Sequence, residues 1–207
     1  MALFLEDQQI EIYRTLCGSD NNNAYLIVCS ETRESVLIDA PLNPGAILEH
    51  AIGTVVKAIL ITHRHKDHTE GLAEAITKTQ APVLAHPADI EEIPASCIPV
   101  EDGQRIAFGK NEVVAIHTPG HTPGSTCFLI GKYIFTGDTV YSGGPGESRG
   151  PEATIQILKN ITEKIYTMPD DTVVFPGHGH HSILAVPKKE YRVFHSEHPD
   201  ILPPIPD

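Results

Sequence analysis

The stretch Thr62-His63-Arg64-His65-Lys66-Asp67-His68 brings four residues that can bind a metal into six positions. These four are His63, His65, Asp67 and His68. Burying three imidazoles and a carboxylate so close together would leave too many polar groups without partners. A divalent cation satisfies all of them at once, and borderline metals such as zinc accept mixed nitrogen and oxygen ligands. The stretch therefore predicts a metal centre.

This metal-binding stretch follows an apolar run, Val55 to Thr62, that is typical of a strand buried on both faces. Open α/β sheets place their ligands where such a strand runs out into a loop. Other short, β-branched runs predict further strands, and helical spacing predicts helices. The predicted strands are 25–29, 35–39 and 82–85, antiparallel strands within 105–116 and 127–135 with a hairpin turn at Gly131-Lys132, and a final strand 173–175; the predicted helices are 44–52, 72–76 and one opened by Pro151, whose Ile155, Leu158, Ile161 and Ile165 share a face.

The length of the chain bounds its domain organisation. The 207 residues, 41% of them hydrophobic, suffice for one domain with a sizeable core and are too few for two substantial domains. The sequence shows no internal linker and no repeat at residue level. We therefore predict a single domain over residues 1–207, with an extended, proline-rich C-terminal tail from about residue 195.

The net charge and the absence of targeting signals limit the kinds of partner and the compartment expected for this protein. The formal net charge is −12, and the longest basic cluster is the dipeptide Lys188-Lys189, so nucleic acid is excluded as a partner. The start of the chain lacks the features of a signal peptide, and no window approaches 18 uninterrupted apolar residues, so no membrane partner is expected. The four scattered cysteines form no C-x-x-C pair and are typical of reduced thiols. Together these features predict a cytoplasmic protein that acts on a small molecule.

Three later segments present further candidate ligands on rigid turns next to glycine. The segment Thr118-Pro119-Gly120-His121-Thr122-Pro123-Gly124-Ser125 carries His121, Phe135-Thr136-Gly137-Asp138-Thr139 carries Asp138, and Phe175-Pro176-Gly177-His178-Gly179 carries His178. Each lies in a stiff turn, and the last two follow the end of a predicted strand. Such turns suit a fixed coordination geometry, so these three residues complement the first stretch.

The order of these motifs resembles the metallo-β-lactamase-fold superfamily. The pattern His-x-His-x-Asp-His, followed by a histidine, an aspartate and a final histidine, extends over nearly the whole chain. The phrases around His121 and Asp138 are most similar to the glyoxalase II-like metallohydrolase branch. The resemblance implies an α/β fold (α+β by some schemes), a four-layered αββα sandwich with the metals at one edge between the two sheets.

Carried over residue by residue, the resemblance also implies two metal sites. His63, His65 and His121 would form one site. Asp67, His68 and His178 would form the other, and Asp138 would bridge both metals. Asp39 matches an aspartate that supports the metal loop without ligating. The implied cofactors are two divalent metal ions, zinc in the first place and iron or manganese as alternatives.

The chain departs from named branches of the superfamily at particular positions. Zinc β-lactamases have a cysteine or another residue where Asp138 stands, and flavo-diiron oxygen reductases have glutamate where His65 stands. The loop from Gly143 to Arg149 and the residue His180 lack the basic and tyrosine side chains that hold glutathione in glyoxalase II. We therefore expect neither antibiotic hydrolysis nor redox diiron chemistry, and no glutathione site of that type.

The function that the resemblance implies is a dinuclear metal-dependent hydrolase, similar to hydroxyacylglutathione hydrolase, that cleaves a thioester or related ester with a metal-bridging hydroxide. Its catalytic residues would be Asp67, Asp138 and Tyr141. A tyrosine at the place of Tyr141 donates a hydrogen bond to the substrate oxygen in lactonases of the superfamily, and packing at a strand end is the alternative. Arg149 is either a partner for an anionic substrate group or a solvated loop charge.

Several alternatives stay open at this point. A mononuclear iron persulfide dioxygenase would use only His63, His121 and Asp138 as ligands, a lactonase is a variant within the hydrolase class, and a non-catalytic binding module would be expected to lose ligands. The tail is either a surface arm or a contact with a second subunit in a homodimer. His180 and His181 lie either at the pocket mouth or in a solvated loop. Substrate choice is expected to lie in loops 141–151 and 178–195.

Overall fold

Two β-sheets form the centre of the protein. The computed structural model describes residues 3–7, 9–197 and 204–205. Within these residues one sheet has seven strands in the order of the sequence, and the other has six in the order β15-β14-β11-β10-β9-β8. The first contains β1 (Leu5–Glu6), β2 (Ile10–Cys17), β3 (Asn22–Cys29), β4 (Glu34–Ile38), β5 (Val55–Leu60), β6 (Val83–Ala85) and β7 (Cys97–Pro99); the second contains β8 (Arg105–Phe108), β9 (Asn111–His117), β10 (Thr126–Ile130), β11 (Tyr133–Gly137), β14 (Val173–Pro176) and β15 (Ser182–Ile183), and β12 (Val140–Tyr141) pairs with β13 (Gly144–Pro145).

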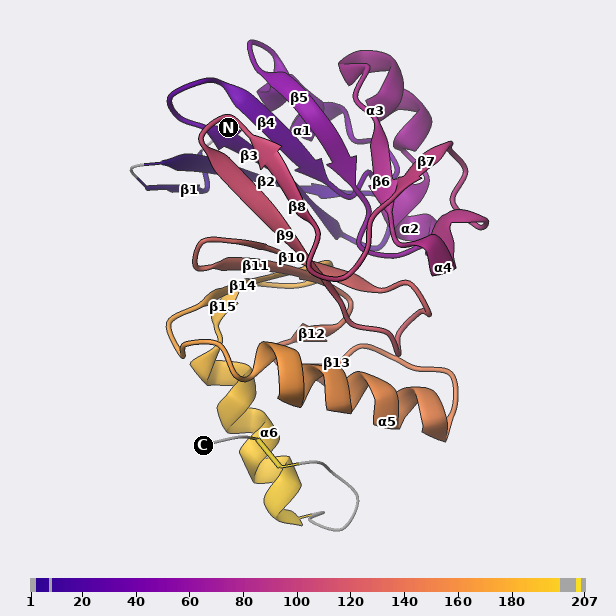
Figure 1. Cartoon of the computed structure of the whole chain (residues 1–207), viewed down its shortest axis with the longest axis vertical. Helices are drawn as coiled ribbons and strands as arrows, with labels where there is room; N and C mark the ends of the chain where they lie inside the picture. The colour runs from indigo at the N-terminus through magenta and orange to yellow at the C-terminus, as the bar shows by residue number, and fades with distance from the viewer. Residues whose placement is uncertain (1–2, 8, 198–203, 206–207) are drawn as a thin grey trace.

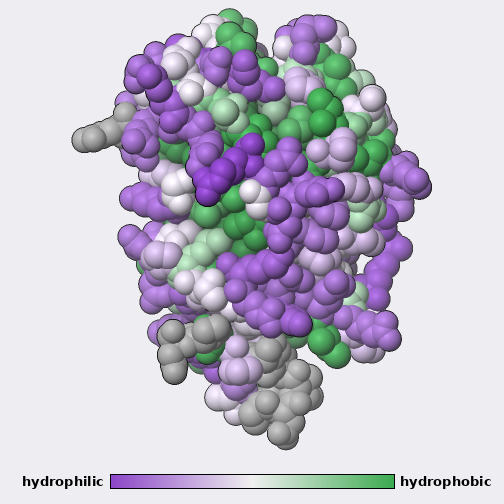
Figure 2. All heavy atoms as spheres, in the orientation of Figure 1, coloured by the Kyte–Doolittle hydropathy of each residue, from purple (hydrophilic) through white to green (hydrophobic). Residues whose placement is uncertain are grey.

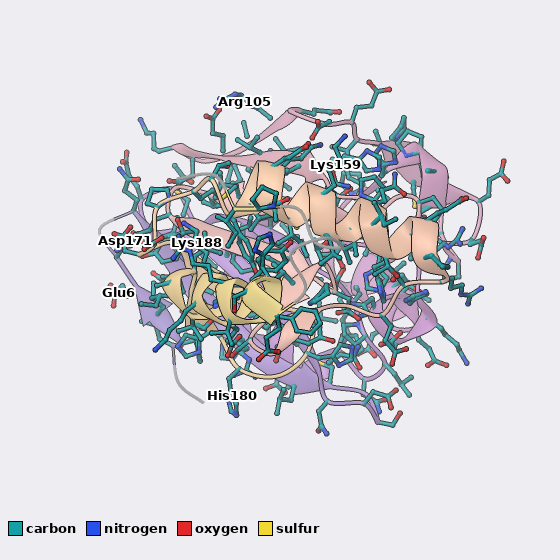
Figure 3. All side chains as sticks on the ribbon, turned by 90° about the horizontal axis from the view of Figure 1, so that it is seen from below. Glu6, Arg105, Lys159, Asp171, His180 and Lys188 are labelled. Atoms are coloured by element: carbon teal, nitrogen blue, oxygen red, sulfur yellow. The ribbon has the colours of Figure 1, made fainter. Side chains whose placement is uncertain are left out.

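Helices cover the outer face of each sheet, as Figure 1 shows. The helices of the first half of the chain lie on the seven-stranded sheet, and those of the second half lie on the six-stranded sheet. Figure 3 shows from below that the last two helices lie side by side. The helices are α1 (Gly45–Ala51), α2 (Lys66–Thr69), α3 (Leu72–Thr79), α4 (Pro87–Ile90), α5 (Pro151–Asn160) with a π-helical continuation η1 (Ile161–Ile165), and α6 (Ala185–Glu197).

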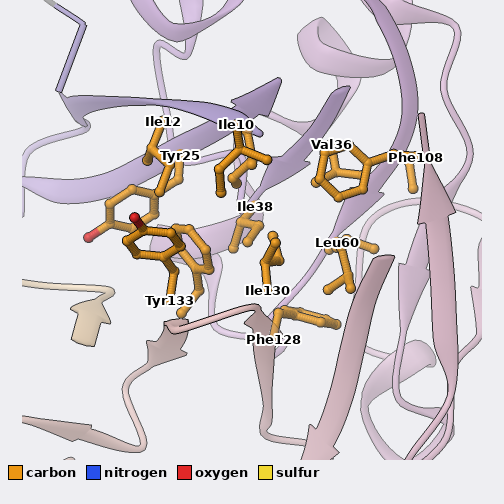
Figure 4. Packing of buried hydrophobic residues seen from close by; sticks show 14 of the residues in the cluster. Ile10, Ile12, Tyr25, Val36, Ile38, Leu60, Phe108, Phe128, Ile130 and Tyr133 are labelled. Atoms are coloured by element: carbon orange, nitrogen blue, oxygen red, sulfur yellow. The ribbon is translucent and has the colours of Figure 1, made fainter. Parts of the chain in front are cut away.

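Three separate hydrophobic clusters fill the spaces between these layers. Alternate residues of β3 point to opposite faces, so Tyr25 and Ile27 join the cluster between the sheets while Leu26 and Val28 join the cluster under α1 and α3. Figure 4 shows the first of these clusters, where Phe128 and Tyr133 of the second sheet pack toward the first. A third cluster lies between the second sheet, α5, η1 and α6. Three cores between four layers confirm the αββα sandwich expected from the sequence.

Most of the predicted elements are present. The strands expected at 25–29, 35–39, 55–62, 82–85 and 173–175 correspond to β3, β4, β5, β6 and β14, and the helices at 44–52 and 72–76 correspond to α1 and α3. The expected antiparallel pairs are β8 with β9 and β10 with β11, the latter turning at Gly131. Cys17, Cys29, Cys97 and Cys127 are free thiols, as expected.

The C-terminal region differs from the prediction. Val173–Pro176 is not the final strand, since β15 and the helix α6 follow it. The helix continues through residues 195–197, where the extended tail was expected to begin; residues 198–203 and 206–207 lie outside the described residues. Lys188 of α6, labelled in Figure 3, donates to the carbonyl of Met168 and the carboxylate of Asp170. Of the expected tail, Ile205 packs on the third cluster.

The predicted face of α5 is wrong at one position. Leu158, Ile161 and Ile165 are buried, but Ile155 is 59% exposed. Ile157 takes its place in the core. At about 100° per residue, Ile155 lies about 200° around the helix from Ile157, and the π-helical turn after Asn160 shifts the phase of the residues that follow.

The surface is consistent with the acidic composition. Figure 2 shows hydrophilic residues over much of one face, with hydrophobic residues in patches between them. Across the part of the chain that the structure describes, no helix has the length and apolar character needed to cross a membrane.

The buried face of α5 and its continuation η1 can be tested by two matched substitutions. Replacing Ile161 by alanine is expected to lower the free energy of unfolding by about 2–5 kcal/mol, because the change leaves a cavity in the core. The same change at Ile155 is expected to cost about 0.5 kcal/mol or less, because this side chain is largely in water. Urea denaturation followed by circular dichroism measures both values. Equal losses would contradict the burial described here.

Candidate metal centre

The first ligand group consists of His63, His65 and His121. His63 and His65 follow the carboxyl end of β5, and His121 lies in the turn after β9, so the two sheets contribute to one group. One nitrogen of each ring lies within 4.8 Å of the others. Nε2 of His121 is 2.9 Å from Nδ1 of His65 and 3.2 Å from Nε2 of His63. The structure therefore brings together the three residues for which the resemblance implies one site.

The second ligand group consists of Asp67, His68 and His178. Asp67 and His68 lie in the short helix α2, and His178 follows the end of β14. Nε2 of His178 is 3.2 Å from Oδ2 of Asp67 and 3.4 Å from Nε2 of His68. The structure thus brings together residues that are more than 100 positions apart in the sequence.

Asp138 lies between the two groups. It follows β11, which is parallel to β14, so its carboxylate reaches the edge where His178 also lies. Oδ1 of Asp138 is 3.5 Å from Nε2 of His68, and Oδ2 is 3.6 Å from Nε2 of His121 and 3.5 Å from Nε2 of His178. One carboxylate therefore faces both groups, which is the position of a bridging ligand.

Hydrogen bonds outside the groups fix the tautomers of three histidines. Nδ1 of His68 donates to Oδ2 of Asp39 over 2.8 Å, and Nδ1 of His121 donates to the carbonyl of Glu147 over 2.6 Å. The hydroxyl of Thr62 donates to Asp39, so its oxygen accepts the Nδ1 hydrogen of His63. When these rings are neutral, Nε2 of each carries a lone pair that points into the site, which is the form a metal binds.

Asp39 supports the metal-binding loop as the sequence predicted. Its side chain is 2% exposed, and besides His68 it accepts the backbone N–H and the hydroxyl of Thr62, both over 2.8 Å. The carboxylate therefore fixes both the start of the loop and one ligand ring. Metal-ligating histidines commonly need such a partner for orientation.

Asn22 is a residue of the site that sequence reasoning missed. Its side-chain amide donates to Oδ2 of Asp67 over 2.9 Å and lies 3.3 Å from Nε2 of His178. Three consecutive asparagines, Asn21 to Asn23, are typical of a turn, but Asn22 and Asn23 begin β3 and are buried. Only the bridge between Asn22 and His178 reveals the role.

Charges in the site favour a cation. Burial opposes the charged form of His68, but the carboxylates of Asp39 and Asp138 outweigh it and raise its pKa to about 10. The hydrogen bond from His178, together with that from Asn22, lowers the pKa of the Asp67 carboxyl. Negative carboxylates thus concentrate at the second group and draw positive charge to it.

The residues present fit a pair of divalent metal ions. Oδ1 of Asp138 is buried and has no hydrogen-bond partner among the described residues. In the first group, burial and the neighbouring His68 and His121 lower the pKa of His63 well below its usual value, which keeps the ring neutral and able to bind a metal. Gly177 completes the fit, because a side chain there would overlap Asp138 and His68.

Two further predicted residues lie beside the ligands. Tyr141 ends β12 and is partly buried; burial, and then the charges of Asp138 and Glu147, raise its pKa, so the hydroxyl keeps its proton. Arg149 lines a cavity of about 370 Å³ together with His65 and His121. Tyr141 thus lies within the electrostatic influence of Asp138, and Arg149 shares a cavity with two residues of the first group.

An αββα sandwich with two His/Asp groups and a shared aspartate at one sheet edge defines the class of this protein. A profile of the Metallo-beta-lactamase superfamily matches residues 17–178, and the chain belongs to this family. Hydroxyacylglutathione hydrolase from Brucella ovis is 33% identical over 177 residues, which cover 83% of this chain and 67% of that protein.

Solved structures support the same assignment. TTHA1623 in a di-iron-bound form is 29% identical, with a TM-score of 0.72 over 84% of this chain and 96% of that one. ETHE1 from Myxococcus xanthus is 24% identical, with a TM-score of 0.72 over 94% of this chain and 92% of that one. At that identity the likeness to ETHE1 shows the fold alone.

The two-site arrangement predicts the metal content of variants. Protein saturated with zinc and then dialysed is expected to carry two metals per chain by elemental analysis. His65→Ala and His178→Ala are each expected to carry one, because each change removes one of the three side chains of a single group. His180→Ala is the control, since this exposed neighbour of His178 lies at the periphery in Figure 3 and is expected to leave the count at two. A wild-type chain that holds at most one metal would contradict the two-site arrangement.

Proposed function

We propose that this protein is a dinuclear metal-dependent hydrolase that cleaves a thioester or a related ester. The position of Asp138 carries the proposal, because its two oxygens lie 3.5–3.6 Å from ring nitrogens of both ligand groups. The similarity to hydroxyacylglutathione hydrolase supports a thioester as the substrate class.

Seven side chains would hold the metal pair. His63, His65 and His121 would hold one ion, Asp67, His68 and His178 would hold the other, and Asp138, whose oxygens face both groups, would be available to either ion. When bound, the pair supplies an activated water at neutral pH and polarises the substrate carbonyl. Zinc suits this mixture of imidazole and carboxylate ligands, and so do iron and manganese; the di-iron form of TTHA1623 supports iron as an alternative.

The protein's own residues would position the substrate and stabilise charge. Tyr141, with its proton retained, would donate a hydrogen bond to the carbonyl oxygen as negative charge develops there. Arg149, in the cavity beside His65 and His121, would meet an anionic group of the substrate. A thiolate leaving group is a weak base, so departure needs no strong general acid.

The remaining features fit a cytoplasmic enzyme for small molecules. The net charge of −12 disfavours nucleic acid, and a cavity of about 370 Å³ is of the size that binds a small ligand.

Thioester hydrolysis is the direct test of the proposed function. The zinc-loaded protein is expected to release free thiol from an α-hydroxyacyl thioester, and a chelator is expected to lower the rate at least about 100-fold, because metal catalysis supplies several kcal/mol. Adding zinc back should restore the rate. Lactones and oxygen esters, assayed beside the thioester, define the preferred ester class. A single iron per chain, with oxygen uptake on a persulfide and no thioester cleavage, would instead favour the dioxygenase.

The role of Tyr141 is tested by removing its hydroxyl alone. Tyr141→Phe is expected to lower kcat about 100-fold with little change in KM, because the hydrogen bond forms mainly in the transition state. Metal content should stay at two, since Tyr141 belongs to neither ligand group. An unchanged kcat would show that this tyrosine only packs at the end of its strand.

A further inference from the structure

The turn that carries His121 contains more polar residues than its one ligand explains. Thr122, Gly124 and Ser125 follow His121 and turn toward α4. There they meet Asp89, whose side chain is 1% exposed. None of these contacts belongs to the two ligand groups, so this buried carboxylate has another role.

Asp89 accepts hydrogen bonds from two separate loops. Oδ2 accepts the backbone N–H of Arg64 over 3.0 Å and the hydroxyl of Thr122 over 2.6 Å. Oδ1 accepts the backbone N–H of Gly124 over 2.9 Å, and Nε of Arg64 lies 3.8 Å from it. All of these partners are donors, which matches an ionised carboxylate because it can only accept.

These two loops carry every member of the first ligand group, and the loop after β5 also leads into α2, which carries Asp67 and His68 of the second. Arg64 lies between His63 and His65, and Thr122 directly follows His121. The second group is held by other contacts, from Asn22 to Asp67 and from Asp39 to His68. The side chain of Asp89 therefore bonds to both loops of the first group, and among the described residues it accepts no hydrogen bond from a member of the second.

The contact between Asp89 and the His121 turn leaves no room for a side chain at Gly124. A Cβ at Gly124 would lie 2.5 Å from Cγ and 2.7 Å from Cβ of Asp89. Ser125 adds a hydrogen bond from the backbone N–H of Thr122 to its hydroxyl oxygen over 2.9 Å. The sequence Thr-Pro-Gly-Ser after His121 is thus explained as a surface that fits this one carboxylate.

We infer that Asp89 is a positioning residue that fixes the three-histidine group for its metal and leaves the second group unaffected. The inference goes beyond the proposed hydrolysis and rests on the two-metal arrangement within it. Precise placement matters because ligand rings must already lie in the coordination geometry before the ion binds. Asp89 would achieve this by holding the β5 loop and the His121 turn at a fixed separation.

The test is metal affinity in the full-length protein, measured by competition with a chelator. Asp89→Asn replaces one accepting oxygen by an amide that faces donors, so the loops are expected to separate. One of the two zinc affinities should fall about 10–100-fold, which is the usual effect of losing an outer partner of a metal ligand. The other affinity should stay at its wild-type value.

Two double variants identify the affected site. His178→Ala leaves the first group as the complete one, so adding Asp89→Asn should weaken the remaining metal by the same factor of about 10–100. His65→Ala leaves the second group complete, so adding Asp89→Asn should change nothing. Equal weakening in both backgrounds, or no weakening in either, would overturn the inference. A wild-type chain that binds no zinc would contradict the proposed function itself.

Asp7 provides a matched control for general destabilisation. Its carboxylate also accepts two backbone N–H groups and one hydroxyl, from Gln9, Ile10 and Tyr133. Asp7→Asn is expected to lower stability and to leave both zinc affinities unchanged. If Asp89→Asn does not fold, Thr122→Val removes the 2.6 Å hydrogen bond to Asp89, together with the 2.9 Å contact of the same hydroxyl with Ser125, and is expected to weaken the first site about 10-fold. An unchanged affinity in Thr122→Val would then overturn the inference.

Discussion

The carboxylate of Asp138, facing both ligand groups, is the contact on which this protein's architecture depends. It reaches the edge between the sheets because β11 ends there, and the parallel strand β14 delivers His178 to the same edge. The loop after β5, in the other sheet, supplies the remaining ligands of the second group. Burying so many imidazoles and carboxylates is unfavourable unless each finds a partner. A pair of cations would satisfy them together, and binding of metal would then reinforce the packing of the two sheets.

A small number of buried polar groups outside the ligand groups position the ligand side chains, each by contacts to different residues. Asp39 fixes the start of the metal-binding loop and the ring of His68, whereas Asn22 holds Asp67 close to His178. Each of these contacts links strands or loops that are far apart in the sequence. The ligand geometry is therefore set by tertiary hydrogen bonds and not by the local spacing of the motifs alone.

Local sequence signals were sufficient to predict the candidate ligands and most strands. They were insufficient where tertiary contacts determine which residues are buried or paired. The seven candidate ligands could be named because His-x-His-x-Asp-His concentrates more imidazole and carboxylate groups than a core without a metal accommodates, and because the order of the three later turns resembles that of the metallo-β-lactamase superfamily. Ile155 was expected in the core because its spacing from Leu158 is helical, but the buried face of α5 is centred between Ile157 and Leu158, and Ile155 lies about 100° away from that centre. Asn22 looks like a turn residue until its partner His178 is brought beside it. The helix α6 was not predicted because Pro187 and a charged run interrupt its apolar pattern. Packing on the third cluster stabilises this helix.

The helix α6 also links the C-terminal region to the active site. Glu190 accepts a hydrogen bond from the hydroxyl of Ser142 over 3.0 Å and from the N–H of Gly143 over 2.8 Å. These two residues follow Tyr141 in the β12–β13 hairpin, and further along the same loop the carbonyl of Glu147 accepts from His121. The hairpin is thus held at one end by α6 and at the other by a metal ligand. Tyr141 directly precedes the two residues that Glu190 holds, so a shift of α6 is expected to change the position of Tyr141. The same loop bonds to His121 through Glu147, so the position of Tyr141 and the position of the first histidine group are coupled.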